Sequence, residues 1–295
     1  MYTAKTMKRT DDTTTRLHPL MIFLAMLWTS LPLSAQTMAD NDMSSPQTCM
    51  HAIMVGAGWS NVLESYLSPY NYTGTDFTVI RETMRPTKLM QGKVDVQTLF
   101  QINGSILDNR AKTAKEYAGG LRYGINWQYT WDVAKGLKVM AGPGASAYLG
   151  GIYNDRNGNN PGQAKGDIMV DLTAQAFYNF RLFRREWMLR YEMTVPFIGM
   201  AYTPNYGQSY YEAFELENYD HNLQFAHFAN TPSMRHLLTI SMPMKSAILR
   251  FGVSANYQQA KLNGLKYHNY NTDIMVGVAK YFERKTTTRN HVLPF

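Results

Sequence analysis

Asp220 and His221 are the residues of this chain whose types and adjacency are best suited to catalysis. A carboxylate beside an imidazole can act as a general base that activates a water molecule. Adjacent residues of an extended chain point to opposite sides, however, and no second acidic pair accompanies these two. His221, His227 and His236 also lack the close spacing of a zinc site. The sequence therefore predicts no metal and no cofactor, and Asp220 and His221 are its only catalytic candidates.

A larger group of candidate site residues consists of ionisable side chains that alternate with apolar ones. Five bases and four acids of this kind would share the interior of a barrel, namely Asp95, Arg122, Lys138, Asp171, Arg181, Arg190, Glu192, Arg250 and Asp273. A small barrel is filled by its own side chains, and an unpaired charge inside it costs several kcal/mol. We therefore predict a salt-bridged, largely closed polar lumen. A lumen of hydrated, independent charges is the alternative.

Strands must position these residues, because apolar and polar residues alternate over long stretches of the chain. The stretch Leu121–Trp131 alternates without a break, and about ten residues is the length that a tilted strand needs to cross a membrane. We predict an all-β fold, an antiparallel up-and-down barrel of ten strands over residues 51–282. The predicted strands are 51–58, 77–85, 94–103, 116–131, 137–150, 166–183, 186–200, 234–243, 247–259 and 270–282.

The connections between these strands alternate between long and short, as a barrel with tight periplasmic turns and extended outer loops requires. The long ones, such as 59–76 and 201–233, would lie outside the cell, with both termini in the periplasm. Three turn-favouring pairs fall in these outer loops, namely Asn103-Gly104, Asn157-Gly158 and Asn263-Gly264. These strand directions place an aromatic girdle at the periplasmic ends of the strands, made of Trp127, Tyr129, Trp131, Phe180, Trp187, Tyr281 and Phe282.

Alternation alone does not decide which face of the barrel points outward. In a membrane barrel Phe251 and Val253 would face lipid while Arg250 and Ser254 face the lumen; a soluble barrel of the lipocalin type would have the reverse arrangement. The charged fraction of 17% is below the roughly 25% of soluble domains. Together with the length of the strands, this favours the membrane arrangement.

The N-terminal segment has the order of features that is typical of a secretory signal peptide. Basic residues precede a short apolar run within Leu20–Leu33, and small residues follow up to Ala35. We predict a signal peptide over residues 1–35, a periplasmic lead-in over 36–50 and a C-terminal tail over 283–295. The formal net charge is +7, but the basic residues are scattered, so no nucleic-acid partner is expected.

Two segments resemble a known family. They are Asn61–Pro69, followed by Tyr72-Thr73-Gly74, Glu82 and Arg85, and the later stretch His227–Thr239. Both are similar to a family of uncharacterised outer-membrane barrels from Bacteroidetes-type bacteria. The resemblance implies outer-membrane location and barrel architecture, and it implies no activity. The last strand ends in Tyr281-Phe282 and resembles the C-terminal insertion signal of bacterial outer-membrane proteins.

The longest loop, residues 201–233, is rich in tyrosine and phenylalanine. Such side chains suit contact with an extracellular sugar or protein, and they suit equally a lid that packs on itself, so both interpretations stay open. We expect a non-enzymatic barrel of the outer membrane, in contact with outer-membrane lipid, with a structural or surface-interaction role. The alternatives are a narrow solute channel and an outer-loop hydrolase. The hydrolase would be similar to the omptin proteases, from whose Asp-x-His pair the adjacent Asp220 and His221 depart.

Overall fold

The computed structural model of the chain describes residues 47–183, 185–244 and 247–284. The chain divides into two units at residues 44 and 45, and every described residue belongs to the second. The predicted signal peptide, lead-in residues 36–46 and the tail from residue 285 lie outside the described residues. The elements in chain order are β1 (Gln47–Glu64), β2 (Tyr72–Pro86), η1 (Leu89–Gly92), β3 (Val94–Asn109), β4 (Lys115–Ala134), β5 (Leu137–Asn154), β6 (Gly162–Leu182), β7 (Arg185–Tyr202), α2 (Tyr210–Phe214), β8 (Leu223–His227), β9 (Met234–Pro243), β10 (Ile248–Leu262) and β11 (Leu265–Arg284).

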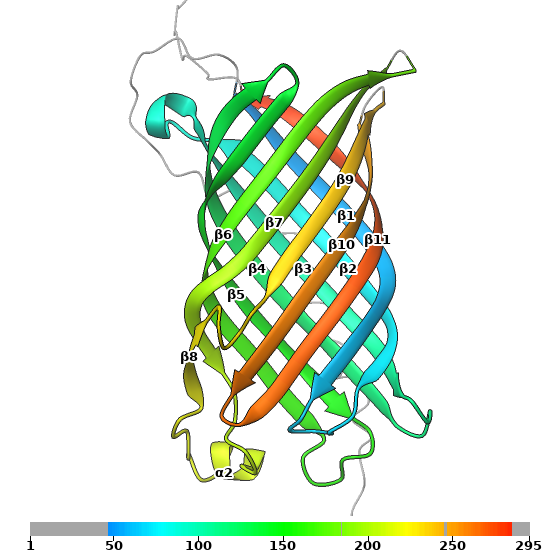
Figure 1. Ribbon diagram of the computed structural model, residues 1–295, viewed down its shortest axis with the longest axis vertical. Coiled ribbons are helices and arrows are strands. Elements are labelled where there is room, and N and C mark those ends of the chain that lie inside the picture. Colours follow the sequence, from blue (N-terminus) through cyan, green and yellow to red (C-terminus); the bar gives the residue numbers. More distant parts are fainter. Residues whose placement is uncertain (1–46, 184, 245–246, 285–295) are drawn as a thin grey trace, which may run out of the picture. The chain divides into compact units, whose positions relative to one another are not determined.

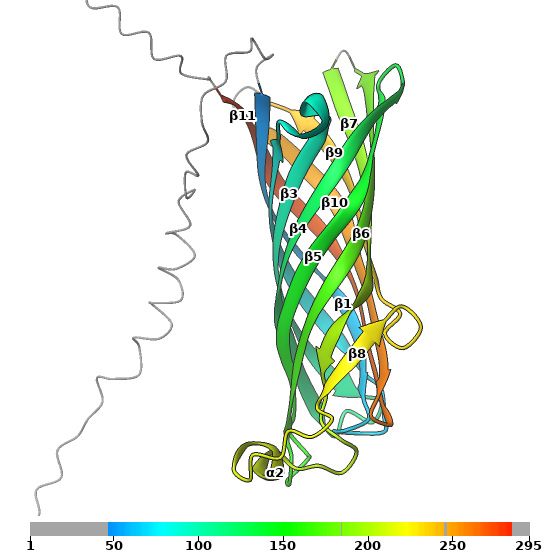
Figure 2. The same cartoon turned by 90° about the vertical axis from the view of Figure 1, so that its left-hand side faces the viewer.

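Ten of these strands form a closed antiparallel barrel (Figure 1, Figure 2). Each strand pairs with its neighbours in the sequence, β6 pairs with β7, and β1 pairs with β11 along all 18 of its residues to close the ring. The exception is β8, which was not predicted and pairs only with the end of β7. The predicted fold class is confirmed. Among the described residues, no helix is long and apolar enough to cross a membrane.

The barrel has two ends, which we name by what they carry. The terminal end is where β1 begins and β11 ends; the loop end carries α2 and the connections 65–71, 110–114, 155–161, 203–233 and 263–264 (Figure 1). Most strands extend further toward the loop end than predicted, so the expected long connection 59–76 shrinks to 65–71. For the same reason Asn103-Gly104 lies inside β3, and its prediction as a loop is wrong. Asn263-Gly264 does form the β10–β11 turn, with positive φ at both residues.

The apolar face of the barrel points outward and the polar face inward. Ile168, Phe251 and Val253 are exposed, whereas Asp171 and Arg250 are buried. This confirms the membrane arrangement of the faces against the lipocalin arrangement. Six residues of the predicted girdle share the outward face near the terminal end; Tyr281 does not, because it alternates in phase with the buried Ala279.

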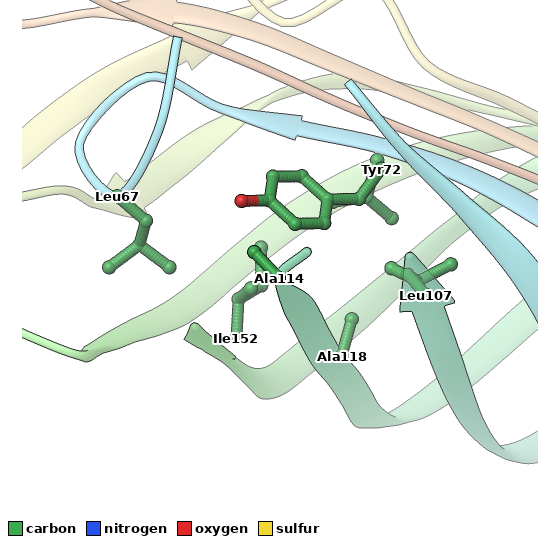
Figure 3. Packing of buried hydrophobic residues seen from close by; sticks show 7 residues of the cluster. Leu67, Tyr72, Leu107, Ala114, Ala118 and Ile152 are labelled. Atoms are coloured by element: carbon green, nitrogen blue, oxygen red, sulfur yellow. The ribbon is translucent and has the colours of Figure 1, made fainter. Parts of the chain in front are cut away.

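An apolar cluster fills the lumen at the loop end on the side of β1 to β5. Leu67, Tyr72, Leu107, Ala114, Ala118 and Ile152 point toward one another there, joined by Val62 (Figure 3). At the loop end, the lumen beside β1 to β5 is therefore packed with apolar side chains. The opposite side, beside β7, β8 and β10, is packed differently, as described below.

Candidate functional site in the lumen

Eight polar side chains cross the middle of the lumen in one hydrogen-bonded group, which we call the Arg–Glu–Gln network. Its members come from seven strands: Glu82 (β2), Gln97 (β3), Gln128 (β4), Gln175 (β6), Arg190 and Glu192 (β7), Arg235 (β9) and Arg250 (β10). All eight are buried. Period-two alternation turns each of these residues inward, and closure of the barrel brings their ends together.

Arg190 is the centre of the network. Its guanidinium group donates to both carboxylate oxygens of Glu82, through Nη1 at 2.7 Å and through Nη2, and its Nη2 also donates to Glu192. Its Nε donates to Gln175 Oε1 at 2.8 Å, and its plane lies over the Phe177 ring at 5.3 Å. Such bidentate, charge-assisted bonds are the strong ones in a low-dielectric interior.

The two carboxylates of the network have further partners. Gln97 Nε2 donates to Glu82 and to Glu192, at 2.7 Å each. Arg250 Nη1 donates to Glu82 at 3.3 Å, and Arg235 Nη2 donates to Glu192 at 2.5 Å. Three guanidinium groups thus surround two carboxylates. This pairing offsets much of the cost of burying the charges, and it places eight side chains across the middle of the lumen.

The structure distributes the nine predicted lumen residues over several places. Arg190, Glu192 and Arg250 belong to the network, Arg122 and Asp171 lie on its loop-end side, and Asp95 lies half-buried on the lumen face of β3. The prediction is wrong for Lys138 and Arg181. Their side chains are 57% and 74% exposed at the terminal end, where they pair with Asp132 and Glu186. Both occupy positions that the alternation assigns to the lumen face, but these positions lie beyond the enclosed part of the barrel.

Asp273, the ninth predicted residue, belongs to a second buried group. In the register it and Asp76 lie on either side of Gly58, which has no side chain to separate them. Asp76 accepts hydrogen bonds from Ser105, from Thr78 and, at 3.3 Å, from Asn271. Both carboxylate oxygens of Asp273 are buried, and among the described residues neither accepts a hydrogen bond of ordinary geometry. This pair of acids is therefore less well compensated than the network.

Two adjacent cavities lie between the network and the loop end, on the side of β7 and β10. The larger measures about 70 Å³ and extends from Arg122 to Gln259 and Tyr267. The smaller measures about 40 Å³ and reaches Asp171 and Arg235. Both are lined by Arg122, Pro196, Ser233 and Gln258, so they adjoin, and we refer to them together as the hollow region. It is the counterpart of the apolar cluster on the other side of the barrel mouth.

The 203–233 connection folds over the loop end and is held there by tyrosines. Tyr66 Oη donates to the Gln208 carbonyl at 2.7 Å, and Tyr210 Oη donates to Gln163 Oε1 at 3.1 Å while accepting from Ala164 N. Burial raises the pKa of the Tyr210 phenol above its ordinary value. Part of the aromatic loop thus packs on the barrel as a lid, whereas Tyr206, Tyr211 and Tyr219 remain exposed.

The two catalytic candidates do meet, in contrast to the expectation that they point apart. His221 has a positive φ of 58°, and this turn brings its Nδ1 to 2.9 Å from Asp220 Oδ1. Both side chains are more than 70% exposed, and neither lines the two cavities. Among the described residues, no group of three His, Cys, Asp or Glu side chains could hold a metal ion.

The predicted lumen residues did not include five of the eight members of the network, namely Glu82, Gln97, Gln128, Gln175 and Arg235. Glu82 had a usable signal, since it continues the inward series of β2 through Thr78 and Ile80. Gln97, Gln128 and Gln175 are uncharged, so a pattern of ionisable residues does not include them. The missing information was the register, which alone shows that side chains from seven strands lie at the same depth.

Comparisons with known proteins give one family and several similar structures. The model of a family described as "Protein of unknown function (DUF3316)" matches residues 19–289. No curated protein matches the chain. The outer membrane protease OmpT from Escherichia coli is 9% identical, with a TM-score of 0.45 over 84% of this chain and 100% of that one. The translocator domain of the autotransporter NalP from Neisseria meningitidis is 10% identical, with a TM-score of 0.39 over 82% and 90%. The attachment invasion locus protein Ail of Yersinia pestis is 10% identical, with a TM-score of 0.29 over 79% and 98%.

Proposed function

The chain belongs to the DUF3316 family of proteins of unknown function, and from this premise we propose that it is a non-enzymatic outer-membrane barrel that does not conduct solutes and that interacts with other molecules through its loop end. The family match supports the resemblance noted in the sequence, although the bacterial group stays a prediction.

The Arg–Glu–Gln network is the observation that supports a closed lumen. A solute that passed along the barrel axis would have to displace Arg190, whose guanidinium group is bonded to Glu82, Gln175 and Glu192. Breaking one partner out of a buried ion pair typically costs about 3–5 kcal/mol. The alternative function for the same fold is that of a narrow solute channel. A barrel with this interior is poorly suited to that function.

Planar-bilayer recording tests this proposal directly. We expect the protein to show no stable large conductance, and we expect a variant in which Gln97, Gln128 and Gln175 are all replaced by Ala to show discrete channel openings, because three side chains of the network are removed. Gln91→Ala, an exposed position in η1, is the control. A stable conductance of the unaltered protein, or solute uptake by liposomes that contain it, would show that the channel alternative is right.

The location and the lipid partner follow from the outward face. Ile53, Val55, Leu149, Ile168 and Ile274 are large apolar residues that the barrel wall exposes, and water is a poor solvent for such a surface. We therefore place the barrel in the outer membrane, with lipid around it. Fractionation of cell envelopes should recover the protein in the outer-membrane fraction, and its recovery in the soluble periplasm would contradict the proposal.

The loop end supplies the surface for an extracellular ligand, because Tyr206, Tyr211, Leu216 and Tyr219 of the connection are exposed beside the docked lid. The hydrolase alternative uses Asp220 and His221, whose 2.9 Å contact is the one observation in its favour. Incubation of the purified protein with casein and with phospholipid vesicles distinguishes the two. Hydrolysis that disappears in His221→Ala, with the barrel still folded, would overturn the non-enzymatic proposal.

A further inference from the structure

The barrel wall is incomplete where β9 begins. The β7–β9 ladder ends at Thr194 and Arg235, and the β9–β10 ladder ends at Tyr257 and Met234. Both β7 and β10 continue toward the loop end beyond these points. There β8 pairs with β7, from Ile198 to Tyr202, but no ladder joins β8 to β10 among the described residues. We call this gap, along residues 258–262 of β10, the β8–β10 seam (Figure 1).

A short loop and a few hydrogen bonds bridge the seam. Lys261 N donates to the Asn230 carbonyl at 2.8 Å, and Gln259 N donates to Ser233 Oγ at 3.4 Å. Segments held by few bonds open locally at low free energy, whereas a full ladder opens only with the barrel. The seam is therefore the part of the wall that opens most readily.

The larger cavity lies directly behind the seam. Ala226 and Ser233 line it from one side, and Ala260 and Leu262 line it from the other. Gln259 also lines it, although Gln259 belongs to the exposed, outward-facing set of β10. The lining of the cavity thus includes residues from both faces of the wall at the seam.

The outward-facing residues beside the seam are suited to contact with lipid. Five large apolar side chains are exposed along β7 and β8 next to it, namely Phe197, Ile198, Met200, Leu223 and Phe225. A contiguous exposed patch of this kind marks a membrane or ligand contact. An opening of the seam would therefore face hydrocarbon chains rather than bulk water.

The inner end of the hollow region carries unused cationic hydrogen-bond donors. The Arg122 side chain is only 16% exposed, and its one engaged nitrogen, Nη1, makes two long contacts, at 3.3 Å to Ser146 Oγ and at 3.5 Å to Asp167 Oδ1. A guanidinium group has five N–H donors. Arg235 Nη1 is buried without a partner among the described residues and belongs to a side chain that lines the adjoining cavity. The carboxylates of Asp167 and Asp171 also line the hollow region, and the N–H donors of Arg122 and Arg235 that remain without a partner favour an additional anionic group.

We propose that the β8–β10 seam is a lateral portal through which a single-chain amphiphile with an anionic head group enters the lumen from the membrane, its head group bound by Arg122 and Arg235. The hydrocarbon chain would lie between Ala226 and Ala260, where the lining side chains are small and apolar. A fatty carboxylate and an alkyl phosphate share this chemistry. The portal is independent of the closed centre of the lumen, because it lies on the loop-end side of the network.

Native mass spectrometry of the full chain, released from an uncharged detergent, tests the binding. Decanoate, decyl phosphate and decanol are the probes. We expect saturable one-to-one adducts with one or both anions and none with decanol, and we expect Arg122→Gln to weaken binding by about 10- to 100-fold, the range for a lost charge-assisted hydrogen bond. Arg156→Gln, on an exposed loop, should bind as the unaltered protein does. Equal binding by both variants, or the absence of saturable adducts, would overturn the proposal.

A reversible lock tests the lateral route. In a Cys49→Ser background, Asn230→Cys with Lys261→Cys would place a disulfide across the seam, and Ile53→Cys with Val278→Cys would place one in the intact β1–β11 ladder as the matched control. Heat-dependent gel migration verifies that each variant is a folded barrel. We expect the oxidised seam lock to prevent uptake of the anion from preloaded vesicles, with recovery on reduction and no effect of the control lock. Uptake that is unchanged by the oxidised seam lock would show that the ligand does not enter laterally.

Discussion

Two seams of the barrel contrast in how completely their strands are joined. β1 and β11, the first and last strands, are paired along 18 residues. Beside the β8–β10 seam, by contrast, the ladder between β7 and β9 covers only seven residues, from Met188 to Thr194. In the β1–β11 seam, which we call the sealed seam, backbone N–H and C=O groups pair with one another along the whole height of the wall. At the β8–β10 seam, which we call the open seam, β8 and a short loop cover the part of the wall that no ladder joins. The joint between β1 and β11 is thus fully paired, and the incompletely paired part of the wall lies between strands of the second half of the chain.

Arg190→Ala should lower the free energy of unfolding more than the other substitutions below. The reason is that the Arg–Glu–Gln network connects β2, which lies next to the sealed seam, to β7 and β10 at the open seam. Arg190→Ala leaves Glu82 and Glu192 buried without their main partner. We expect the free energy of unfolding to fall by about 3–5 kcal/mol, measured by urea denaturation in detergent. Arg181→Ala, which alters an exposed pair, should change it by less than about 0.5 kcal/mol. Equal effects of the two variants would mean that the network does not hold the seams together.

A pair of proline substitutions compares the seams themselves. Ile53→Pro removes an N–H from β1, which has ladders on both sides, and should cost at least about 1–3 kcal/mol of unfolding free energy. Gln259→Pro removes a donor whose partner is Ser233 Oγ at 3.4 Å, and should cost less than about 1 kcal/mol. Heat-dependent gel migration of the two variants measures the difference. A greater loss for Gln259→Pro would contradict the assignment of the open seam.

Sequence patterning predicted the strands and separated their two faces because alternation is a local property, whereas the low charged fraction and the length of the strands indicated which face points outward. Each of Arg250, Phe251 and Val253 shows its face within a few residues. Bonds that cross the lumen depend instead on register and on strand tilt, so the partners of Arg190 could not be read from alternation. Alternation also overestimated the lumen at its ends, where Lys138 and Arg181 keep inward parity but meet water. The short strand β8 was hidden inside a loop that composition made look irregular.

The sealed seam has a weakness of its own at Asp273. Its carboxylate is buried next to Asp76, across Gly58 of β1, and accepts no hydrogen bond of ordinary geometry from the described residues. Asp273→Asn removes a buried charge and adds an N–H that can donate to Asp76. We expect the unfolding free energy to rise by about 1–2 kcal/mol, measured by urea denaturation. Ser254→Ala, at the paired β10 position, is the control for local packing, and a loss of stability in Asp273→Asn would show that the carboxylate has a partner that it needs.

The smallest effect on global stability should come from Asn263, which fastens the lid next to the open seam. Its Nδ2 donates to the His221 carbonyl at 2.8 Å and to the Thr203 carbonyl at 3.3 Å. Asn263→Gly keeps the positive φ that this turn requires and removes only the side chain. The unfolding free energy should change by less than about 0.5 kcal/mol, because no ladder is touched. The 203–233 connection contains tyrosine and phenylalanine but no lysine or arginine, so chymotrypsin is the suitable probe, and it should cleave the connection faster in Asn263→Gly while β1 and β11 stay intact. If cleavage were equally slow in the variant, the lid would be held by Tyr66 and Tyr210 alone, and opening of the seam would not involve Asn263.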